Sequence, residues 1–172
     1  DAPSIGTPED NTVHESGLLG GSDEGVAVVT AAGNLGVRVG ADSAAGGGSA
    51  AKVSFAAEQA ALKALNLSSG YDASNAPVLL EYVVTDSVVT AYKGAGRDEA
   101  DKVFTVTITN PGSNAAGYEF TLHKPLNHGA ETKLDLPFDF AVIDGDNDPA
   151  NNKFTITVTD DAPAGTAGEY VL

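Results

Sequence analysis

Four segments in the second half of the chain alternate apolar and polar residues with the period of two that a half-buried β-strand requires. In "VFTVTIT", Phe104, Val106 and Ile108 alternate with threonines. The breaks between the segments are short and rich in Gly, Pro, Asn and Asp, so antiparallel neighbours are predicted. The other three segments are "YEFTL" (118–122), "LDLPFDFAVI" (134–143) and "FTITVT" (154–159).

Further strands are predicted upstream, and the total of about eight favours an all-β antiparallel sandwich. One segment differs, because residues 56–65 are rich in Ala, Leu, Glu, Gln and Lys, with Leu62 and Leu65 on one helical face. A short helix is predicted there. Pro77 is expected at the start of a strand, where its missing N–H is tolerated. The upstream strands are "GVAVV" (25–29), "LGVRV" (35–39), "APVLLEYVV" (76–84) and "SVVTAY" (87–92).

The organisation of the chain indicates one module, residues 1–163, from a tandem array. "DAP" at residues 1–3 returns at 161–163, where the last predicted strand ends. Residues 164–172 are therefore interpreted as the truncated start of a following repeat or a tail. The low-complexity stretch 43–51, "SAAGGGSAA", is predicted to be a flexible loop, with a removed insertion and an engineered join as alternative explanations.

Composition narrows the classes of partner. The 172 residues, 42% hydrophobic, suffice for one ordinary core, and a formal net charge of −15 disfavours nucleic acid and anionic membranes. No apolar run is long enough to span a membrane. Cysteine is absent, which leaves oxygen ligands for any bound cation, and methionine is absent even at position 1, which indicates a piece of a longer polypeptide.

Four segments together resemble the Ig-like tandem repeats of giant RTX adhesins, which Gram-negative bacteria export by type I secretion. They span most of residues 12–163. The resemblance implies an Ig-like or cadherin-like sandwich that is secreted to the cell surface, and a structural role in adhesion or biofilm formation. It also implies neighbouring repeats of the same chain, or an inserted ligand-binding module, as partners. The segments are "VHESGLLGG", "VSFAAEQAALKALNL", "YEFTLHKPLNHGAE" and "FAVIDGDNDPANNKFTITVTDDAP".

The acidic stretch "VIDGDNDP" is the leading candidate for chemistry. Asp144, Asp146 and Asp148 begin like an EF-hand loop, but Pro149 and Thr155 stand where that loop needs Gly and Glu. In an extended chain these carboxylates would lie too far apart to share one ion, so the loop must curl. A solvated turn is the alternative, and Ca²⁺ is the cofactor that the acids and the resemblance together favour.

Strand parity predicts where each acid lies. Asp144 continues the inward row that ends at Val142, and Asp160 continues the row that ends at Val158. In a hairpin the two carboxylates would mark opposite ends of the sandwich. We therefore expect two calcium sites of the interdomain type. One combines Asp144, Asp146 and Asp148 with Asp1, Glu9 and Asp10, and the other is an incomplete site at Asp160 and Asp161 that awaits the next module.

Other chemistry finds little support in the sequence. The three histidines, His14, His123 and His128, form no metal-binding spacing and lie beside no nucleophile motif, so an enzyme is not expected. A calcium-stabilised, monomeric extender or scaffold module is the favoured function. The alternative is a module that itself binds carbohydrate or a surface.

Overall fold

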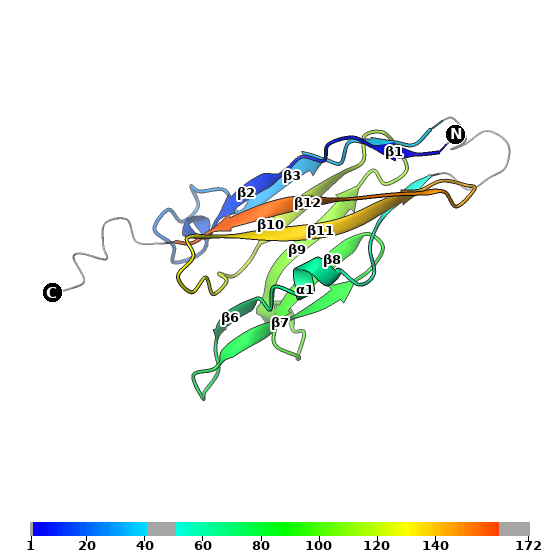
Figure 1. Cartoon of the computed structure of the whole chain (residues 1–172). Coiled ribbons are helices and arrows are strands. Elements are labelled where there is room, and N and C mark those ends of the chain that lie inside the picture. The colour runs from blue at the N-terminus through cyan, green and yellow to red at the C-terminus, as the bar shows by residue number, and fades with distance from the viewer. Residues whose placement is uncertain (1, 41–50, 162–172) are drawn as a thin grey trace.

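Two curled β-sheets packed face to face dominate the computed structural model, which describes residues 2–40 and 51–161 (Figure 1). A third sheet of two short strands lies at one end. The described residues contain twelve strands and one α-helix of four residues. The predicted all-β, sandwich-like architecture with one short helix is confirmed.

The larger sheet has six strands, all paired antiparallel. Along most of β9 and β10, buried apolar residues alternate with more exposed residues, as the sequence pattern predicts. In spatial order the strands are β3 (Thr30–Asn34), β10 (Gly117–Leu122), β9 (Lys102–Thr109), β8 (Val88–Lys93), β7 (Pro77–Val84) and β6 (Ser68–Tyr71).

The smaller sheet has four strands and is built on the β11–β12 hairpin. Its register pairs Lys133 with Thr159 and Ile143 with Pro149. The pairing of β2 with β12 is parallel, a departure from the predicted antiparallel arrangement. The strands in order are β2 (Asn11–His14), β12 (Pro149–Thr159), β11 (Lys133–Ile143) and β5 (Lys52–Phe55), and the two-stranded sheet contains β1 (Ser4–Ile5) and β4 (Val37–Arg38).

A stack of aromatic rings joins the two large sheets. The ring of Tyr118 on β10 lies 3.9 Å from that of Phe154 on β12, centroid to centroid. Phe138 on β11 meets Phe104 on β9 edge to face at 5.8 Å. All four side chains are almost fully buried. Burial of rings of this size is the largest apolar contribution available to a chain without Trp or Met.

Two local predictions are corrected by the structure. Residues 25–29 form turns and loop instead of a strand, and Val26 is 83% exposed, because the strand begins only at Thr30. The helix α1 covers only Ala60–Lys63 and not 56–65. Gln59 precedes it with a left-handed backbone (φ 44°), and Leu65 lies beyond its end and is 46% exposed.

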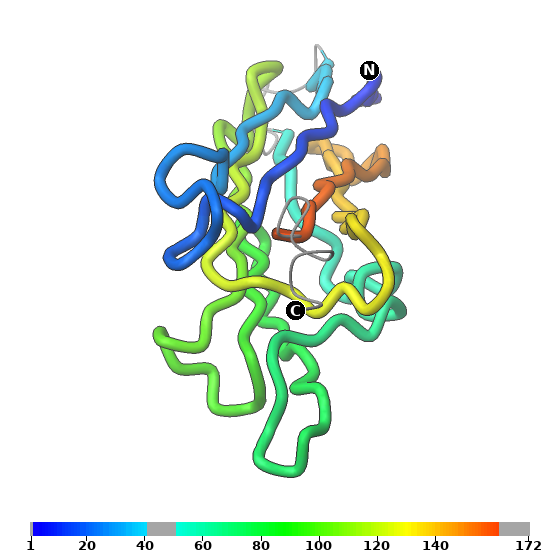
Figure 2. Tube along the Cα trace, turned by 90° about the vertical axis from the view of Figure 1, so that its left-hand side faces the viewer, coloured from blue at the N-terminus to red at the C-terminus, as the bar shows by residue number. Residues whose placement is uncertain are grey.

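The molecule is elongated along the hairpin, and β1 and the hairpin tip lie at one end while β12 ends at the other (Figure 1). The 3₁₀ turn η1 (Glu15–Gly17) lies near that second end, and η3 (Glu99–Asp101) precedes β9. The β6–β7 hairpin projects beyond the smaller sheet (Figure 2). No described helix has the length and apolar character needed to cross a membrane.

Several predictions fall outside the described residues. They are Asp1, nearly all of the stretch 43–51, and the proposed following repeat, 164–172.

Candidate functional site

The acidic loop joins β11 to β12 and curls as the sequence requires. Oδ1 of Asp144 accepts the backbone N–H groups of Asp146 (3.0 Å) and Asp148 (2.9 Å). Asn147 adopts a left-handed backbone (φ 65°), which Asn tolerates well. Asp144 is 4% exposed, whereas the other two aspartates are exposed. One carboxylate therefore shapes the loop, and two face solvent at the tip.

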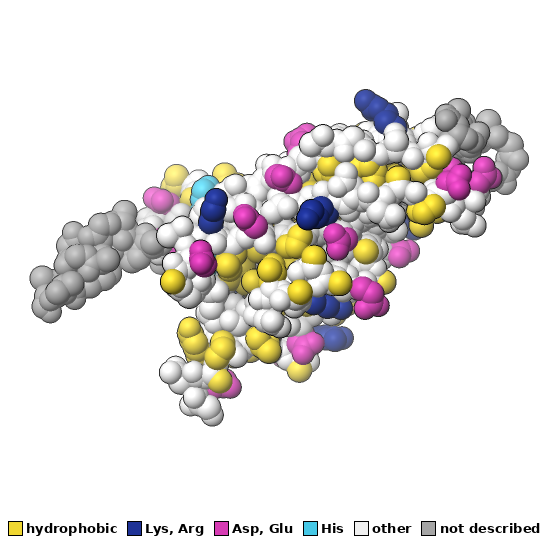
Figure 3. All heavy atoms as spheres, viewed as in Figure 1, with side chains coloured by type: hydrophobic (Ala, Val, Ile, Leu, Met, Phe, Trp, Pro, Cys, Tyr) yellow, Lys and Arg dark blue, Asp and Glu magenta, His cyan; other side chains and the backbone are white. Residues whose placement is uncertain are grey.

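The second oxygen of Asp144 has no partner among the described residues. Oδ2 is buried and accepts no hydrogen bond there. A buried carboxylate oxygen without a donor is unusual, because burial of a charge requires compensation. A cation bound at the tip would supply it. Figure 3 shows acidic side chains gathered at this end of the molecule.

The acids near the N-terminus lie along β12 and not at its tip. Oδ1 of Asp10 accepts the N–H of Thr155 at 2.8 Å, and the carbonyl of Glu9 accepts the hydroxyl of Tyr118 at 2.6 Å. Thr155 is six residues along β12 from Pro149, or about 20 Å at roughly 3.3 Å per residue. Among the described residues, Glu9 and Asp10 therefore do not join the aspartates of the loop.

Asp160 and Asp161 lie at the opposite end, as predicted from strand parity and shown by the hairpin register. The N–H of Asp160 donates to the carbonyl of Thr132 at 2.9 Å. The carboxylate of Asp161 accepts the backbone N–H of Ser22 at 3.1 Å and its hydroxyl at 2.5 Å. The loop after η1 is thereby fixed to the end of β12.

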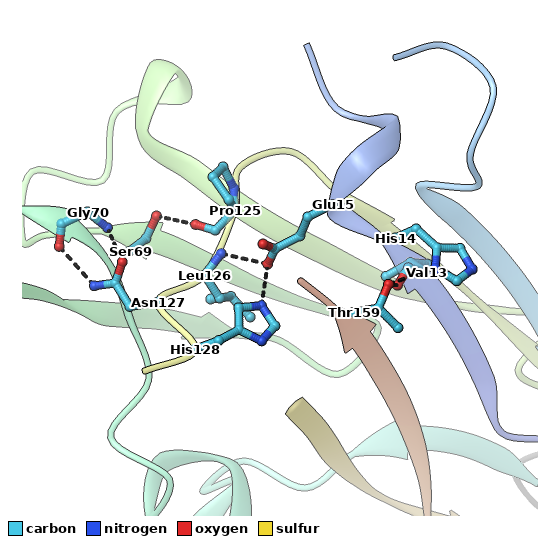
Figure 4. A network of polar contacts seen from close by, with 10 residues as sticks. All are labelled: Val13, His14, Glu15, Ser69, Gly70, Pro125, Leu126, Asn127, His128 and Thr159. Atoms are coloured by element: carbon cyan, nitrogen blue, oxygen red, sulfur yellow. Dashed lines mark hydrogen bonds and ion pairs between the residues drawn. The ribbon is translucent and has the colours of Figure 1, made fainter. Parts of the chain in front are cut away.

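Asp160 also belongs to a cluster with Glu15 and His128. Figure 4 shows Glu15 between Leu126 and His128. One potential ligand atom from each side chain lies within 4.8 Å of the other two. Oε2 of Glu15 is 2.8 Å from Nε2 of His128 and accepts the N–H of Leu126, also at 2.8 Å. It is the one group of three or more His, Cys, Asp or Glu side chains this close together in the part of the chain that the structure describes.

Both buried members of this cluster are positioned by backbone contacts. Glu15 opens η1 directly after β2, where the chain turns at the end of the sheet. His128 lies in the connection between β10 and β11, which is tied to β6 by two hydrogen bonds from Nδ2 of Asn127, to Oγ of Ser68 (2.9 Å) and to the carbonyl of Gly70 (3.0 Å). The cluster thus depends on three separate parts of the fold.

The environment of Glu15 in this cluster favours the protonated form of its carboxyl group. Burial raises the pKa of Glu15 above its usual 4.5, and the nearby charge of Asp160 raises it further, although the Leu126 N–H and His128 oppose the shift. Nδ1 of His128 is buried without a partner among the described residues. A neutral imidazole that carries its proton on Nε2 leaves no unsatisfied N–H there, whereas an imidazolium would.

A cavity of about 220 Å³ lies beside the cluster and is lined in part by Glu15, Asp160 and Asp161. Oε1 of Glu15 takes no hydrogen bond from the described residues, so it remains available as a ligand. Carboxylate oxygens are what Ca²⁺ prefers, and an imidazole that donates to a ligating carboxylate orients it. Glu15, Asp160 and Asp161 could therefore hold a hard cation, with His128 as the orienting group.

The sequence did not point to Glu15 or His128. They are 113 residues apart, so no local spacing connects them. His128 lies in the connection between β10 and β11, where a histidine is ordinarily exposed, but it is only 8% exposed. The one feature of the sequence that could have indicated burial of His128 is the apolar Leu126 in the same connection.

Comparison with known proteins yields no relative: no family model, no curated protein and no solved structure matches this chain.

Proposed function

We propose that the chain is a non-catalytic structural module of a large secreted adhesin, with an Ig-like or cadherin-like sandwich joined end to end to similar modules. Bound Ca²⁺ stabilises its ends, and the array supports adhesion or biofilm formation outside the cell. Neighbouring repeats and, in some copies, an inserted ligand-binding module are its partners. The resemblance of four long segments to RTX adhesin repeats motivates the choice of family.

The observation that carries the proposal is that the first and last described strands reach opposite ends of the long axis. β1 lies beside the tip of the β11–β12 hairpin, and β12 ends at the opposite end of the long axis (Figure 1). Modules connected in this way form a line without a reversal of the chain. An eleven-residue strand spans about 35 Å, so each repeat would add a length of at least that order.

Acidic groups at both ends support a role for cations in the junctions. The tip presents Asp146 and Asp148 to solvent beside the unpartnered oxygen of Asp144. The other end presents Asp160 next to the buried Glu15. A cation shared by facing ends would relieve the repulsion within each group and would restrict bending between modules.

The test uses two copies of the 172-residue chain in tandem, studied by small-angle X-ray scattering. We expect a longer and stiffer particle in millimolar CaCl₂ than in EDTA. Asp160→Asn with Asp161→Asn in the first copy should abolish the difference. The double variant Glu58→Gln with Glu119→Gln, which neutralises two exposed acids elsewhere, is the charge-matched control and should keep it.

Calorimetric titration of the single chain with CaCl₂ separates the two ends. Asp146→Ala with Asp148→Ala should remove the heat of binding at the tip and leave any binding at Asp160. Equal scattering in CaCl₂ and EDTA would sink the proposed role as a calcium-stiffened module. Unchanged heat in the tip variant would exclude only the tip as the site.

A further inference from the structure

The β7 strand has a free edge beyond its partner β6. β6 pairs with β7 only from Pro77 to Leu79, while β7 continues to Val84. The N–H of Leu80 donates to the carbonyl of Leu67 on this side at 3.0 Å, and the carbonyl of Leu79 bonds toward β8. Because successive residues alternate, the N–H and C=O of Tyr82 also face the free side. In the described chain no strand pairs with them there.

A cavity of about 410 Å³ lies along this free edge. Its volume falls within the roughly 300–1,000 Å³ that small-molecule sites occupy. The β6–β7 hairpin, which contributes four of the lining residues, extends past the smaller sheet (Figures 1 and 2). The lining residues come from the end of α1, the segment after it, β7 and the turn before η3. They are Lys63, Asn66, Leu67, Leu79, Leu80, Glu81, Tyr82 and Arg97.

The charge of this cavity is opposite to that of the whole molecule. The chain has 24 acidic and 9 basic residues, yet two of the basic ones, Lys63 and Arg97, line this cavity against one acid, Glu81. The ion pairs found among the described residues, such as Lys52 with Asp86 and Lys102 with Glu99, do not include either cation. Arg97 also has a left-handed backbone (φ 54°), which is uncommon for a bulky residue.

Both polar and apolar side chains line the cavity beside Lys63 and Arg97. Asn66 and Glu81 offer side-chain donors and acceptors, and Leu79 is 57% exposed. Figure 3 shows apolar side chains over the part of the molecule where β6 and β7 lie. The hydroxyl of Tyr82 is buried with no hydrogen-bond partner among the described residues, a situation that is rare in folded proteins.

From this juxtaposition we infer that the cavity along the free edge of β7 binds a carboxylate-bearing sugar. Lys63 and Arg97 pair with the sugar carboxylate, and a guanidinium matches that geometry with two parallel hydrogen bonds. Asn66, Glu81 and the backbone of Tyr82, which has no strand partner on this side, bond hydroxyl groups, and Leu79 contacts the apolar face of the ring. The free edge beyond Leu80 is only a few residues long, which suits a hydroxyl group better than a long added strand. This activity does not depend on the spacer function.

The experiment is an NMR titration of the ¹⁵N-labelled chain in EDTA, so that no cation bridges a carboxylate to the acidic ends. The probes are galacturonate, digalacturonate and N-acetylneuraminate, with galactose as the neutral control. We expect saturable shift changes at the amides of Leu67, Glu81 and Tyr82 with at least one acidic probe, and much weaker changes with galactose.

Two variants test the role of the cations. Lys63→Gln with Arg97→Gln should weaken binding about tenfold or more, since a hydrogen bond to a charged group is lost at each position. Both side chains are exposed, so the fold should persist, and an unchanged spectrum away from the cavity verifies it. Lys124→Gln with Lys133→Gln removes the same charge elsewhere and should change the affinity less than about twofold.

Three outcomes of the sugar titrations would overturn the inference. They are no saturable shift with any acidic probe, equal binding of galactose and galacturonate, and shifts that map away from β7. Binding of triglutamate at the same amides without binding of any acidic sugar would also overturn it, in favour of a peptide site. None of these outcomes bears on the scattering of the tandem chain, so the two proposals fail separately.

Discussion

One carboxylate oxygen, Oε2 of Glu15, accepts both the N–H of Leu126 and Nε2 of His128 inside the fold. It connects the turn after β2 with the connection that precedes β11. Burial of a carboxylate is unfavourable unless its hydrogen bonds compensate, and here two donors serve a side chain that also lies close to Asp160. At the scale of the residue, this end of the molecule is held together by a buried carboxyl group with two hydrogen-bond partners and a second acidic side chain nearby.

The raised pKa of Glu15 makes stability depend on pH. The folded state binds the carboxyl proton more tightly than the unfolded state, whose value is near 4.5. The contribution of Glu15 is therefore most favourable below pH 4.5 and is lost as pH rises through the folded pKa, at about 1.4 kcal/mol per pKa unit. Urea unfolding in EDTA should show the free energy of unfolding of wild type falling relative to Glu15→Gln as pH rises from 4.5 to 7.

A matched comparison makes this assignment specific. Glu58→Gln neutralises an exposed carboxylate and should show no such trend relative to wild type. A wild-type stability that rises relative to Glu15→Gln with increasing pH would mean that the hydrogen bonds outweigh burial, and that the pKa of Glu15 is lowered instead.

At the scale of the element, a single glutamine shortens and anchors the helix. Gln59 is 1% exposed, and its side chain mimics a paired strand. Nε2 donates to the carbonyls of Ala56 (2.9 Å) and Asp139 (2.7 Å), while Oε1 accepts the N–H of Asp139 at 3.0 Å. These contacts fix the start of α1 against the free side of β11. The same left-handed backbone prevents the helix from beginning at residue 56.

Removal of this anchor should be costly. Gln59→Ala leaves the N–H of Asp139 without its partner, while the C=O of Asp139 keeps the N–H of Ala56 at 2.9 Å. One unsatisfied buried group costs about 1–3 kcal/mol, so we expect a loss of about 1–3 kcal/mol in the free energy of unfolding. The adjacent exposed Glu58→Ala should change it by less than about 0.5 kcal/mol. Chemical denaturation monitored by Tyr fluorescence measures both. Similar losses in the two variants would contradict the anchoring role.

At the scale of the whole molecule, charge opposes the folded state. A net charge of −15 on 172 residues produces self-repulsion that the compact state concentrates. The acids are spread over the molecule, but both ends of the long axis carry groups of them that lack enough cationic partners. Counterions should therefore stabilise this protein, and ions that bind at the ends should do so more than ions that only screen.

Salt distinguishes the two effects. Raising NaCl from about 0.01 to 0.15 M shortens the Debye length from about 30 to 8 Å, so the midpoint of thermal unfolding in EDTA should rise. CaCl₂ at the same ionic strength should raise it further, because binding to the folded state adds stability as RT ln(1 + [L]/Kd). Differential scanning calorimetry measures each midpoint. Equal effects of the two salts would show screening without specific binding.

The sequence determined the parts of this protein that depend on local periodicity. Alternation in β9, β10, β11 and β12 predicted which residues point inward, because side chains on a strand change face at every step. The same parity placed Asp144 and Asp160 at opposite ends, and the turn residues predicted the curled loop. Pro77 begins β7 as expected, since that position does not need its missing donor.

Only the tertiary structure decided the contacts between distant segments. The parallel pairing of β2 with β12, the short helix held by Gln59, the cluster of Glu15 with His128 and the free edge at Tyr82 have no local signature. Each arises from the packing of two sheets of unequal width. The larger sheet extends past the smaller one, and the connecting segments cover the ends of the sandwich. Periodicity reports which face of a strand is buried, and packing decides what lies opposite it.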